Sequence, residues 1–427
     1  MLKLKHKNMQ YFFILGNNPT LSLAEISAVF GLDDNSKAEI LSSEIFLLET
    51  ENNFDPAELI KKLGGVIKIG AISNEFNFDN QKIIAEAEKL INTNHEGKIK
   101  FGISHYGNKQ LNLKIIGMEI KKCLREKNVS VRWVTSKERI LSSVVVEQNK
   151  LIAQGAEIIL IQKDNHVLIG QTLAVQPFKE LSFRDYGRPA RDDYSGMLPP
   201  KLAQIMINLA LPVRTQNFVF PGKDTIILDP FCGSGTILTE AMLMGYKNLI
   251  GSDISPKAVE DTEKNITWIK SKFQITNCEL QTYRQNAAKL SQIIKPQSID
   301  AIITEPYLGP QRGKIDIKKT ARELEQLYAK SLSEFSKILK PNGRIVMVWP
   351  VFQGNSLSLR GSESDRSNLT NSILKKTINP DISGFKIINP IPAGLAQNKN
   401  LKLTPRKTII YGRQGQKVWR EIVILEK

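Results

Sequence analysis

The spacing of apolar residues changes character partway along this 427-residue chain. Up to residue 175, short apolar runs such as YFFILG (residues 11–16) alternate with amphipathic stretches such as LSLAEISAVFG (residues 21–31), the patterns of strands and helices. From Asp224 onward the helical stretches become longer and alternate with strands, which is typical of an open, mostly parallel sheet. The pattern predicts small α+β units followed by a larger α/β domain.

These changes in pattern indicate three domains and one linker. We expect a ferredoxin-like unit over residues 1–95, a second α+β unit over residues 96–175, a linker rich in Pro, Gly and charge over residues 176–205, and the α/β domain over residues 206–427. The apolar run at residues 11–15 is too short for a signal peptide and predicts a strand. No run approaches the roughly 18 consecutive apolar residues that span a bilayer, so no membrane partner is expected.

The cysteines indicate the redox compartment of the protein, and the charge distribution indicates the class of its partner. Cys123, Cys232 and Cys278 lie far apart, which argues against a disulfide framework or a zinc site and favours a reducing cytoplasm without a bound metal. The formal net charge is +16; the first hundred residues carry 11 Lys/Arg and 14 Asp/Glu, so the remainder carries +19. This concentration favours a polyanionic partner, although solubility is a simpler use of the lysines. Composition alone does not separate RNA from DNA or from a membrane surface.

Basic residues gather on one expected surface helix, LNLKIIGMEIKKCLREKN (residues 111–128), and on the strand after it, which also holds Trp133. Basic groups beside an aromatic ring can grip a nucleic-acid backbone, whereas a solvated helix face would show the same pattern. Arg312 and Lys314 follow the stretch TEPY (residues 304–307). They are candidates for contacts to phosphates, and the alternative is that they are ordinary charges of an exposed loop. The candidate contacts to nucleic acid are Lys121, Lys122, Arg125, Arg132, Arg312 and Lys314.

The stretch TIILDPFCGSGTILTEAMLMG (residues 225–245) predicts a strand, a glycine turn and a helix. Glycines at such a turn let the backbone approach a ligand at the carboxyl edge of the sheet. Leu238 stands where a dinucleotide fingerprint has its third glycine, and no Gly-Lys-Ser/Thr is present, so phosphate binding is disfavoured. Asp229 at the strand end would suit a cationic amine, such as the methionine end of S-adenosylmethionine.

Two more strands end in polar residues. Asp253 lies near the spacing at which an acid binds ribose hydroxyls, and Asn286 with Ala287 is placed to meet an adenine amino group. A strand-end Asp is also a common helix N-cap, which is the alternative for Asp253. Cys232 is expected to be a small loop residue, because no base lies near it in the sequence. Three such ends in order favour a nucleoside cofactor, with the candidate cofactor contacts Asp229, Phe231, Gly233, Gly235, Thr236, Asp253, Asn286 and Ala287.

The chain resembles a known enzyme family at several points. DPFCGSGT is similar to the cofactor motif of class I amino methyltransferases, and TEPY falls where that group has Asp/Asn-Pro-Pro-aromatic. FILGNNPTLSLAEISAVF, VTSKERILSSVVVEQNKL, GRPARDDYSGMLPPKLAQIMINLA and YGRQGQKVWREIVI resemble the THUMP-containing tRNA guanosine-10 N2-methyltransferases. The resemblance, which covers nearly the whole chain, implies a ferredoxin-like domain, a THUMP domain that holds tRNA, and a Rossmann-like domain that methylates a guanine amino group with S-adenosylmethionine.

The second motif departs from the family pattern. Thr304 takes the Asp/Asn place, Glu305 the first proline, Pro306 the second proline and Tyr307 the aromatic, and these four are the candidate catalytic residues. A threonine is a weaker acceptor than a carboxylate; Glu305 restores the carboxylate from the neighbouring position, or the site is altered in substrate or inactive. A DNA or ribosomal-RNA amino methyltransferase and a non-catalytic RNA-binding protein therefore stay as alternatives. Cysteine-dependent pyrimidine methylation is disfavoured, because no Pro-Cys follows this strand.

Overall fold

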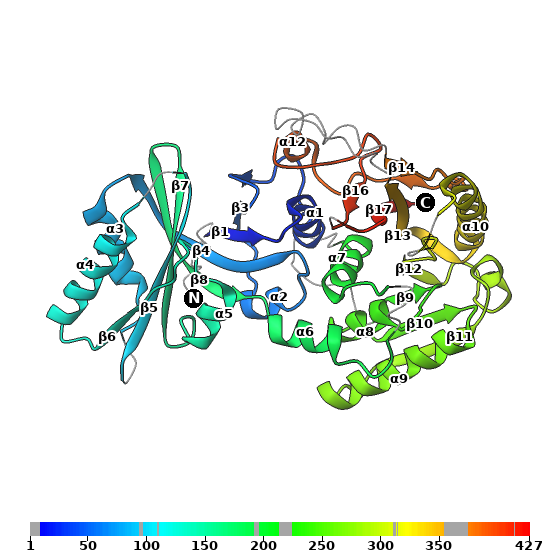
Figure 1. The fold of residues 1–427 in the computed structure, drawn as a ribbon, viewed down its shortest axis with the longest axis horizontal. Helices are drawn as coiled ribbons and strands as arrows, with labels where there is room; N and C mark the ends of the chain where they lie inside the picture. The colour runs from blue at the N-terminus through cyan, green and yellow to red at the C-terminus, as the bar shows by residue number, and fades with distance from the viewer. Residues whose placement is uncertain are drawn as a thin grey trace, which may run out of the picture. The chain divides into compact units, whose positions relative to one another are not determined.

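The structure is a computed structural model that describes residues 9–93, 97–108, 111–191, 196–212, 224–310, 313, 315–353, 375–413 and 415–427. It divides into two compact units, one of residues 1–19 and 34–179 and the other of residues 20–33 and 180–427. The chain therefore passes between the units at three places. Each unit has its own sheet (Figure 1).

The first unit is built on one mixed sheet with the strand order β2-β3-β1-β4-β8-β7-β5-β6 in its described residues. The two small α+β units expected from the sequence thus share a sheet, joined where β4 pairs with β8, and the boundary at residue 95 stays a prediction. The strands are β1 (Met9–Leu15), β2 (Ala38–Ile40), β3 (Ile45–Thr50), β4 (Val66–Asn77), β5 (Ile99–Tyr106), β6 (Val131–Val134), β7 (Gly155–Lys163) and β8 (His166–Val175).

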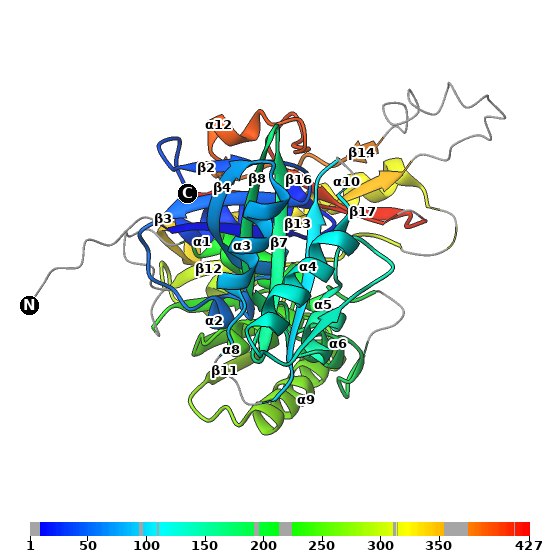
Figure 2. The same cartoon turned by 90° about the vertical axis from the view of Figure 1, so that its left-hand side faces the viewer.

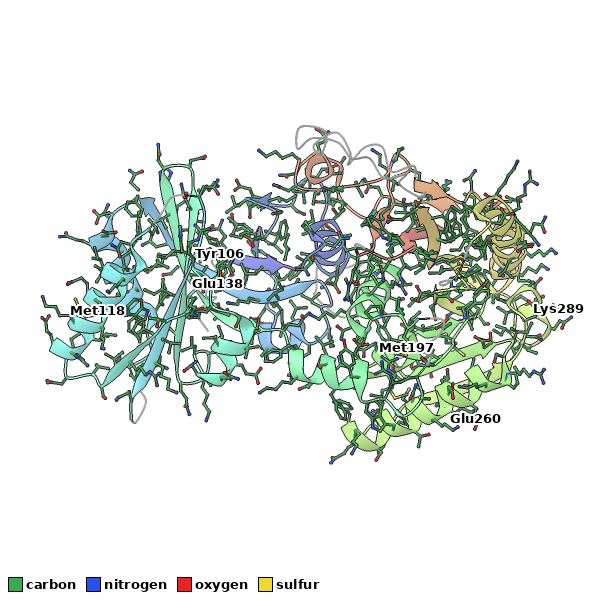
Figure 3. The ribbon with its side chains drawn as sticks, in the orientation of Figure 1. Tyr106, Met118, Glu138, Met197, Glu260 and Lys289 are labelled. Atoms are coloured by element: carbon green, nitrogen blue, oxygen red, sulfur yellow. The ribbon has the colours of Figure 1, made fainter. Side chains whose placement is uncertain are left out.

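Two amphipathic helices cover one face of this sheet (Figures 1 and 2). Helix α3 (Asn80–Leu90) begins after Asp79, whose carboxylate caps two backbone N–H groups, and helix α4 (Leu113–Glu126) follows β5. Their apolar faces pack with Phe101 and neighbouring strand residues into one buried cluster, while Met118 projects from α4 into solvent (Figure 3). The short helices of this unit are α2 (Pro56–Ile60) and α5 (Ser143–Gln148).

The second unit holds a mostly parallel sheet with the strand order β11-β10-β9-β12-β13-β17-β15 in its described residues. Strands β9 to β13 run parallel, and β17 is antiparallel to β13. The strands are β9 (Ile226–Asp229), β10 (Asn248–Asp253), β11 (Glu279–Arg284), β12 (Ile299–Thr304), β13 (Leu339–Gln353), β14 (Lys375–Thr377), β15 (Lys386–Ile387), β16 (Ile409–Tyr411) and β17 (Val418–Glu426).

Helices flank this sheet, with α7 and α8 on one side of its central strands and α10 on the other (Figure 1). The order reverses between β9 and β12, and such a switch point is where open α/β sheets bind ligands at the carboxyl ends of their strands. The helices are α6 (Phe178–Tyr186), α7 (Pro200–Ala210), α8 (Thr236–Leu243), α9 (Pro256–Phe273), η1 (Ala287–Gln292), α10 (Ile317–Ile338) and α12 (Ala393–Ala396).

Helix α1 (Pro19–Phe30) follows a strand of the first unit, yet residues 20–33 belong to the second. Ten of its twelve residues are buried, including Glu25, which accepts a 2.8 Å hydrogen bond from the Asn208 amide on α7. The hydroxyl of Thr20 accepts a bond from the backbone N–H of Lys402 at 2.9 Å. The N-terminal segment thus supplies part of the core of the C-terminal unit.

Candidate active site

A cavity of about 920 Å³ lies in the second unit at the carboxyl ends of β9, β10 and β12. Thr304 and Gly235 do not line it. Among the described residues, no cluster of three or more His, Cys, Asp or Glu side chains has the arrangement of a metal site. The predicted residues that line the cavity are Asp229, Phe231, Gly233, Thr236, Asp253, Asn286, Ala287, Glu305, Pro306 and Tyr307.

The glycine turn after β9 presents bare backbone to the cavity. Gly233 and Gly235 have φ of 52° and 79°, left-handed values that only glycine adopts freely. An added Cβ at Gly233 would find only the carbonyl oxygen of Phe231, at 4.0 Å, so the backbone there faces open space. Gly235 is the N-cap of α8, whose first N–H groups therefore follow the turn directly.

Asp253 at the end of β10 holds this turn in place. Its carboxylate accepts the backbone N–H of Gly233 at 3.1 Å and that of Ser255 at 2.9 Å. The N-cap of α9 is Ser255, whose hydroxyl accepts from the N–H of Ala258, so the capping role considered for Asp253 belongs to Ser255. Asp253 lies on the cavity wall with lone pairs left for a ligand hydroxyl.

Asp229 at the end of β9 is 2% exposed. It accepts the Thr304 hydroxyl at 2.8 Å and the backbone N–H of Phe231 at 3.2 Å. Burial raises its pKa to about 7; the two hydrogen bonds oppose this rise, and the negative charges of Asp253 and Glu305 add to it. A cationic group entering the cavity would therefore meet a carboxyl that ionises near neutral pH.

Two further residues complete the cofactor side. The Asn286 amide oxygen accepts the N–H of Ala288 and caps η1, which leaves the two N–H donors of this amide beside the cavity. Cys232 is 4% exposed, and burial raises the pKa of its thiol, which is thus protonated and a poor nucleophile.

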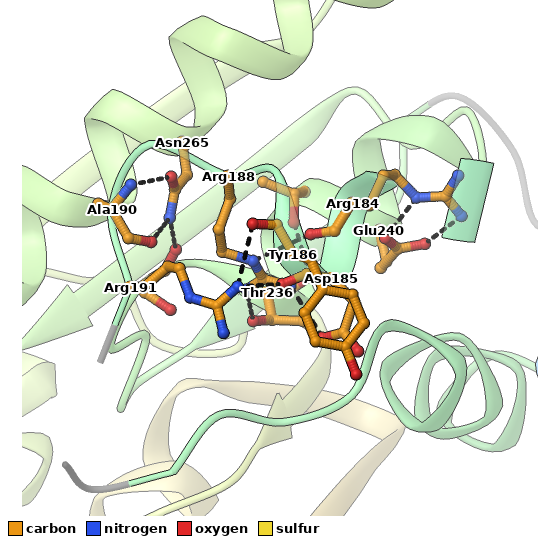
Figure 4. Close-up of polar contacts among 11 residues, drawn as sticks. Arg184, Asp185, Tyr186, Arg188, Ala190, Arg191, Thr236, Glu240 and Asn265 are labelled. Carbon is orange, nitrogen blue, oxygen red and sulfur yellow. Dashed lines mark hydrogen bonds and ion pairs between the residues drawn. The ribbon is translucent and has the colours of Figure 1, made fainter. Parts of the chain in front are cut away.

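The segment expected to be a linker contributes to the site (Figure 4). In helix α6, Arg184 makes a bidentate ion pair with Glu240 of α8, at 2.8 and 3.1 Å. Arg188 donates to the Thr236 hydroxyl at 2.6 Å, at the first residue of α8. These buried bonds fix the segment against the helix that begins at the glycine turn.

The same segment also bonds to α9 (Figure 4). The Asn265 side chain exchanges hydrogen bonds with the backbone of Ala190, at 3.0 and 2.9 Å, and donates to the carbonyl of Ser234 at 2.8 Å. Arg191 lines the cavity and donates to the carbonyl of Tyr186. The sequence reasoning missed these roles; the density of arginines in GRPARDD, among few apolar residues, was the available signal.

The acceptor side of the cavity centres on Glu305, which follows β12. Its carboxylate pairs with the guanidinium of Arg420 on β17 through two hydrogen bonds, from Nε to Oε1 and from Nη2 to Oε2, the second at 3.2 Å. Both residues line the cavity. The sequence reasoning did not predict Arg420. The available signal was the adjacent pair of Arg420 and Glu421 within the otherwise apolar strand VWREIVI, since neighbouring residues of a strand face opposite sides of the sheet.

The rest of the TEPY motif has distinct environments. Thr304 is fully buried and donates to Asp229 rather than facing the cavity. Pro306 is buried, whereas the Tyr307 side chain is 57% exposed at the cavity edge. The Tyr328 hydroxyl of α10 donates to the carbonyl of Tyr307 at 2.8 Å, which fixes the backbone of the motif.

The predicted nucleic-acid contacts are divided between the units. Lys122 and Arg125 are exposed on α4, Lys121 is half-buried, and Arg132 is exposed on the edge strand β6. Arg312 and Lys314 lie outside the described residues. No helix of the described residues combines the length and apolarity needed to cross a membrane. These RNA contacts and the cytoplasmic location stay predictions.

Comparisons with known proteins agree on the chemistry of this fold. A family described as "RMKL-like, methyltransferase domain" matches residues 188–357, and one described as "DNA methylase" matches residues 73–264. The tRNA (guanine(10)-N2)-dimethyltransferase of Methanothermobacter thermautotrophicus is 35% identical over 37% of this chain and 40% of its own length. The protein of that name from Methanocaldococcus jannaschii is 29% identical over 43% of this chain and 48% of its own length. The chain thus spans less than half the length of each of these two relatives.

The crystal structure of TrmN from Thermus thermophilus is similar over 98% of this chain and 99% of that chain, with a TM-score of 0.51 and 16% identity. This chain likewise has an N-terminal sheet region followed by a Rossmann-like domain, which confirms the expected fold class. Residues 188–357 are thus similar to a methyltransferase domain, and the chain resembles tRNA (guanine(10)-N2)-dimethyltransferases over less than half of its length.

Proposed function

We propose that this protein transfers a methyl group from S-adenosylmethionine to the exocyclic N2 of a guanine in tRNA, with guanosine-10 as the target. The observation that carries the proposal is the cavity itself, which joins the glycine turn and Asp253 on one side to Glu305 and Tyr307 on the other. The names of the two archaeal relatives support tRNA and the guanine N2 position.

The residues of the cofactor side suit S-adenosylmethionine, which supplies an electrophilic methyl group on a sulfonium. Bare backbone at Gly233 leaves room for a ligand, and the carboxylate of Asp253 accepts ribose hydroxyls. Asp229, once ionised, neutralises the cationic amine, while Asn286 and Ala287 lie where they can contact the base. Two carboxyl groups at these strand ends would repel the phosphates of a dinucleotide.

The acceptor side must activate a weak nucleophile. The lone pair of a guanine amine is delocalised into the ring, so groups that accept its N–H bonds favour the tetrahedral geometry in which the nitrogen reacts. The carboxylate of Glu305 is such an acceptor, and it also offsets positive charge that develops on nitrogen. Tyr307, exposed at the edge, offers a stacking surface for a base taken out of its helix.

RNA binding by the first unit is the second part of the proposal. Helix α4 exposes Lys122 and Arg125, and the charge of the chain lies outside its first hundred residues. Replacing both residues with alanine should lower tRNA affinity and reduce the slope of log affinity against log salt by about 2, one unit for each phosphate that is no longer neutralised. Lys127→Ala is the control, because Glu88 already pairs with that charge at 2.6 Å. An unchanged slope in the double variant would remove α4 from the RNA surface.

The deciding experiment is transfer of labelled methyl from the cofactor to bulk tRNA, ribosomal RNA and DNA, followed by mapping of the labelled nucleotide. Label in guanine at position 10 of tRNA supports the proposal. Label in adenine of DNA would instead favour the activity suggested by the DNA methylase match at residues 73–264. Tight RNA binding with no transfer to any substrate would identify a non-catalytic RNA-binding protein.

A further inference from the structure

The ion pair between Glu305 and Arg420 has the form of a recognition element. The two side chains are 13% and 12% exposed, so both are largely withdrawn from water yet reach the cavity. Arg420 lies 115 residues after Glu305 in the sequence. It belongs to β17, which pairs with β13. Burial lowers the pKa of Arg420, but the neighbouring carboxylate of Glu305 raises it by more, so the guanidinium stays charged.

The pair keeps hydrogen-bonding capacity after its own contacts are made. Nε and Nη2 of Arg420 each donate once to Glu305, while Nη1 makes no hydrogen bond within the described residues. A guanidinium has five N–H donors and a carboxylate about four lone-pair sites, so each partner has groups to spare. The cavity therefore meets two acceptor oxygens beside at least one N–H donor.

This arrangement matches one nucleobase edge. The Watson–Crick edge of guanine presents N1–H and N2–H as donors and O6 as an acceptor. A carboxylate can accept both N–H groups while a neighbouring guanidinium donates to O6. Adenine presents an amino donor at C6 and an acceptor at N1, which would face the carboxylate lone pairs. Enzymes that act on an extruded base read this edge by such hydrogen bonds.

Asp253 and Asn286 keep free hydrogen-bonding groups on the cofactor side, whereas several other polar side chains at or near the cavity are already paired. Thr304 donates to the buried Asp229, and Lys257 pairs with Asp261. Arg191 donates to backbone carbonyls of its own segment. Glu305 and Arg420 are the charged pair that the cavity wall holds next to Tyr307.

We propose that Glu305 and Arg420 act together to read the Watson–Crick edge of the target base, so that guanine is selected through N1–H and O6 as well as through its amine. This assignment rests on the proposed function. Glu305 is then both acceptor for the reacting amine and part of the specificity element, and Arg420 is a specificity-determining residue that lies outside the TEPY motif.

The test replaces the target guanosine in a tRNA transcript with 2-aminopurine, which keeps the C2 amine but has no O6 and no N1–H. The wild-type enzyme should methylate guanosine with a kcat/KM roughly 5- to 150-fold higher, the discrimination that one bidentate base contact typically provides. In Arg420→Met this ratio should fall but stay above one, because the variant loses the donor to O6 of guanosine while Glu305 still accepts its N1–H. Arg420→Lys keeps a partner for Glu305 and should reduce the ratio less.

Arg406→Met is the matched control. Arg406 pairs in the same bidentate way with the buried Glu421 on β17, at 2.7 Å through Nε, and neither residue lines the cavity. This variant should lose stability without changing the ratio, and cofactor affinity measured by calorimetry shows which variants are folded. Equal wild-type rates on the two bases overturn the assignment, as does a ratio that Arg420→Met leaves unchanged. No transfer to any guanosine transcript would instead contradict the proposed function.

Discussion

The two sides of the cavity are held together by different kinds of contact. On the cofactor side, Asp253 bonds to the backbone of Gly233, twenty residues away, and the strand ends follow one another along the chain. On the acceptor side, Glu305 depends on Arg420, a partner 115 residues away on the last strand. One side is set by local backbone geometry, and the other by the pairing of distant side chains. Substitutions that alter the backbone should therefore damage the cofactor side most, and substitutions that alter charge should damage the acceptor side most.

Glu305→Gln should break the acceptor side with the largest effect. The variant keeps one acceptor oxygen but loses the charge that offsets the developing positive charge, so turnover should fall on the order of 100-fold, about 3 kcal/mol. Its free energy of unfolding should fall too, because Arg420 loses its ionised partner. Single-turnover methylation and thermal unfolding measure the two effects, and cofactor affinity should hardly change.

Glu421→Gln serves as the control for that loss of stability, since Glu421 pairs with Arg406 away from the cavity. It should unfold more easily and keep its turnover. Wild-type turnover in Glu305→Gln would mean that backbone carbonyls alone accept the amine.

Tyr307→Ala should weaken the acceptor side through stacking alone. Base–aromatic stacking contributes about 1–3 kcal/mol, so the affinity for tRNA should fall roughly 5- to 150-fold and turnover with it. Tyr307→Phe removes the hydroxyl but keeps the ring and is the matched variant. Equal losses in both variants would assign the effect to the hydroxyl and not to stacking.

The cofactor side should respond to pH through Asp229. Its pKa of about 7 means that the free protein holds it protonated below neutrality, whereas a cationic amine is bound by the ionised form. Cofactor affinity should thus fall about tenfold for each pH unit below about 7, with proton release on binding. Calorimetric titration in buffers of different ionisation enthalpy measures the affinity and the proton release. Asp229→Asn should bind the cofactor weakly, with an affinity that does not change with pH.

Stability of the unliganded protein should show the opposite trend. Because the folded pKa of Asp229 is raised above its unfolded value, its contribution is complete at acid pH and is lost as the pH rises toward about 7. Asp229→Asn should therefore remove part of the decrease in the free energy of unfolding with rising pH. If wild type and variant show the same pH dependence over that range, the raised pKa is contradicted.

Gly235→Ala should give the smallest effect and test the backbone of the turn. A left-handed conformation costs a residue with a Cβ roughly 1–2 kcal/mol, and here the new atom would also lie 3.0 Å from Thr262. Gly245→Ala has φ of 99° with nothing within 4 Å of the added Cβ, so it isolates the conformational cost. Only Gly235→Ala should lower cofactor affinity; equal effects on binding would show that the turn is not part of the site.

Most residues predicted for the cofactor side line the cavity, because strand ends and glycine turns are local signals in the sequence; their contact with a cofactor stays a prediction. Asp229 and Asp253 end predicted strands, Asn286 follows another, and parallel strands bring their carboxyl ends to one edge. The acceptor side was predicted only in part. Motif spacing located Glu305, but the register of β17 on β13, which supplies Arg420, depends on tertiary packing.

Thr304 and the segment at residues 184–191 show the same limit of local signals. Strand alternation assigns Thr304 to a face, but its hydrogen bond to Asp229 depends on how β12 lies beside β9. Prolines and charges made residues 176–205 resemble a linker, although Arg184 and Arg188 are buried against α8. Hydrophobic periodicity predicts which apolar residues are buried, but it does not indicate the partner of a buried charge. That partner is known only once the packing of the helices is known.

The position of helix α1 has a consequence for the order in which the protein folds. Its residues emerge early during synthesis, but the contacts of Glu25 with Asn208 and of Thr20 with Lys402 span 183 and 382 residues. These two contacts of α1 cannot form until residues 208 and 402 have been made. Such long-range contacts slow folding and favour transient, aggregation-prone states. The nascent chain therefore exposes α1 without these two contacts until residue 402 has been made, which makes the helix a segment for a chaperone to cover.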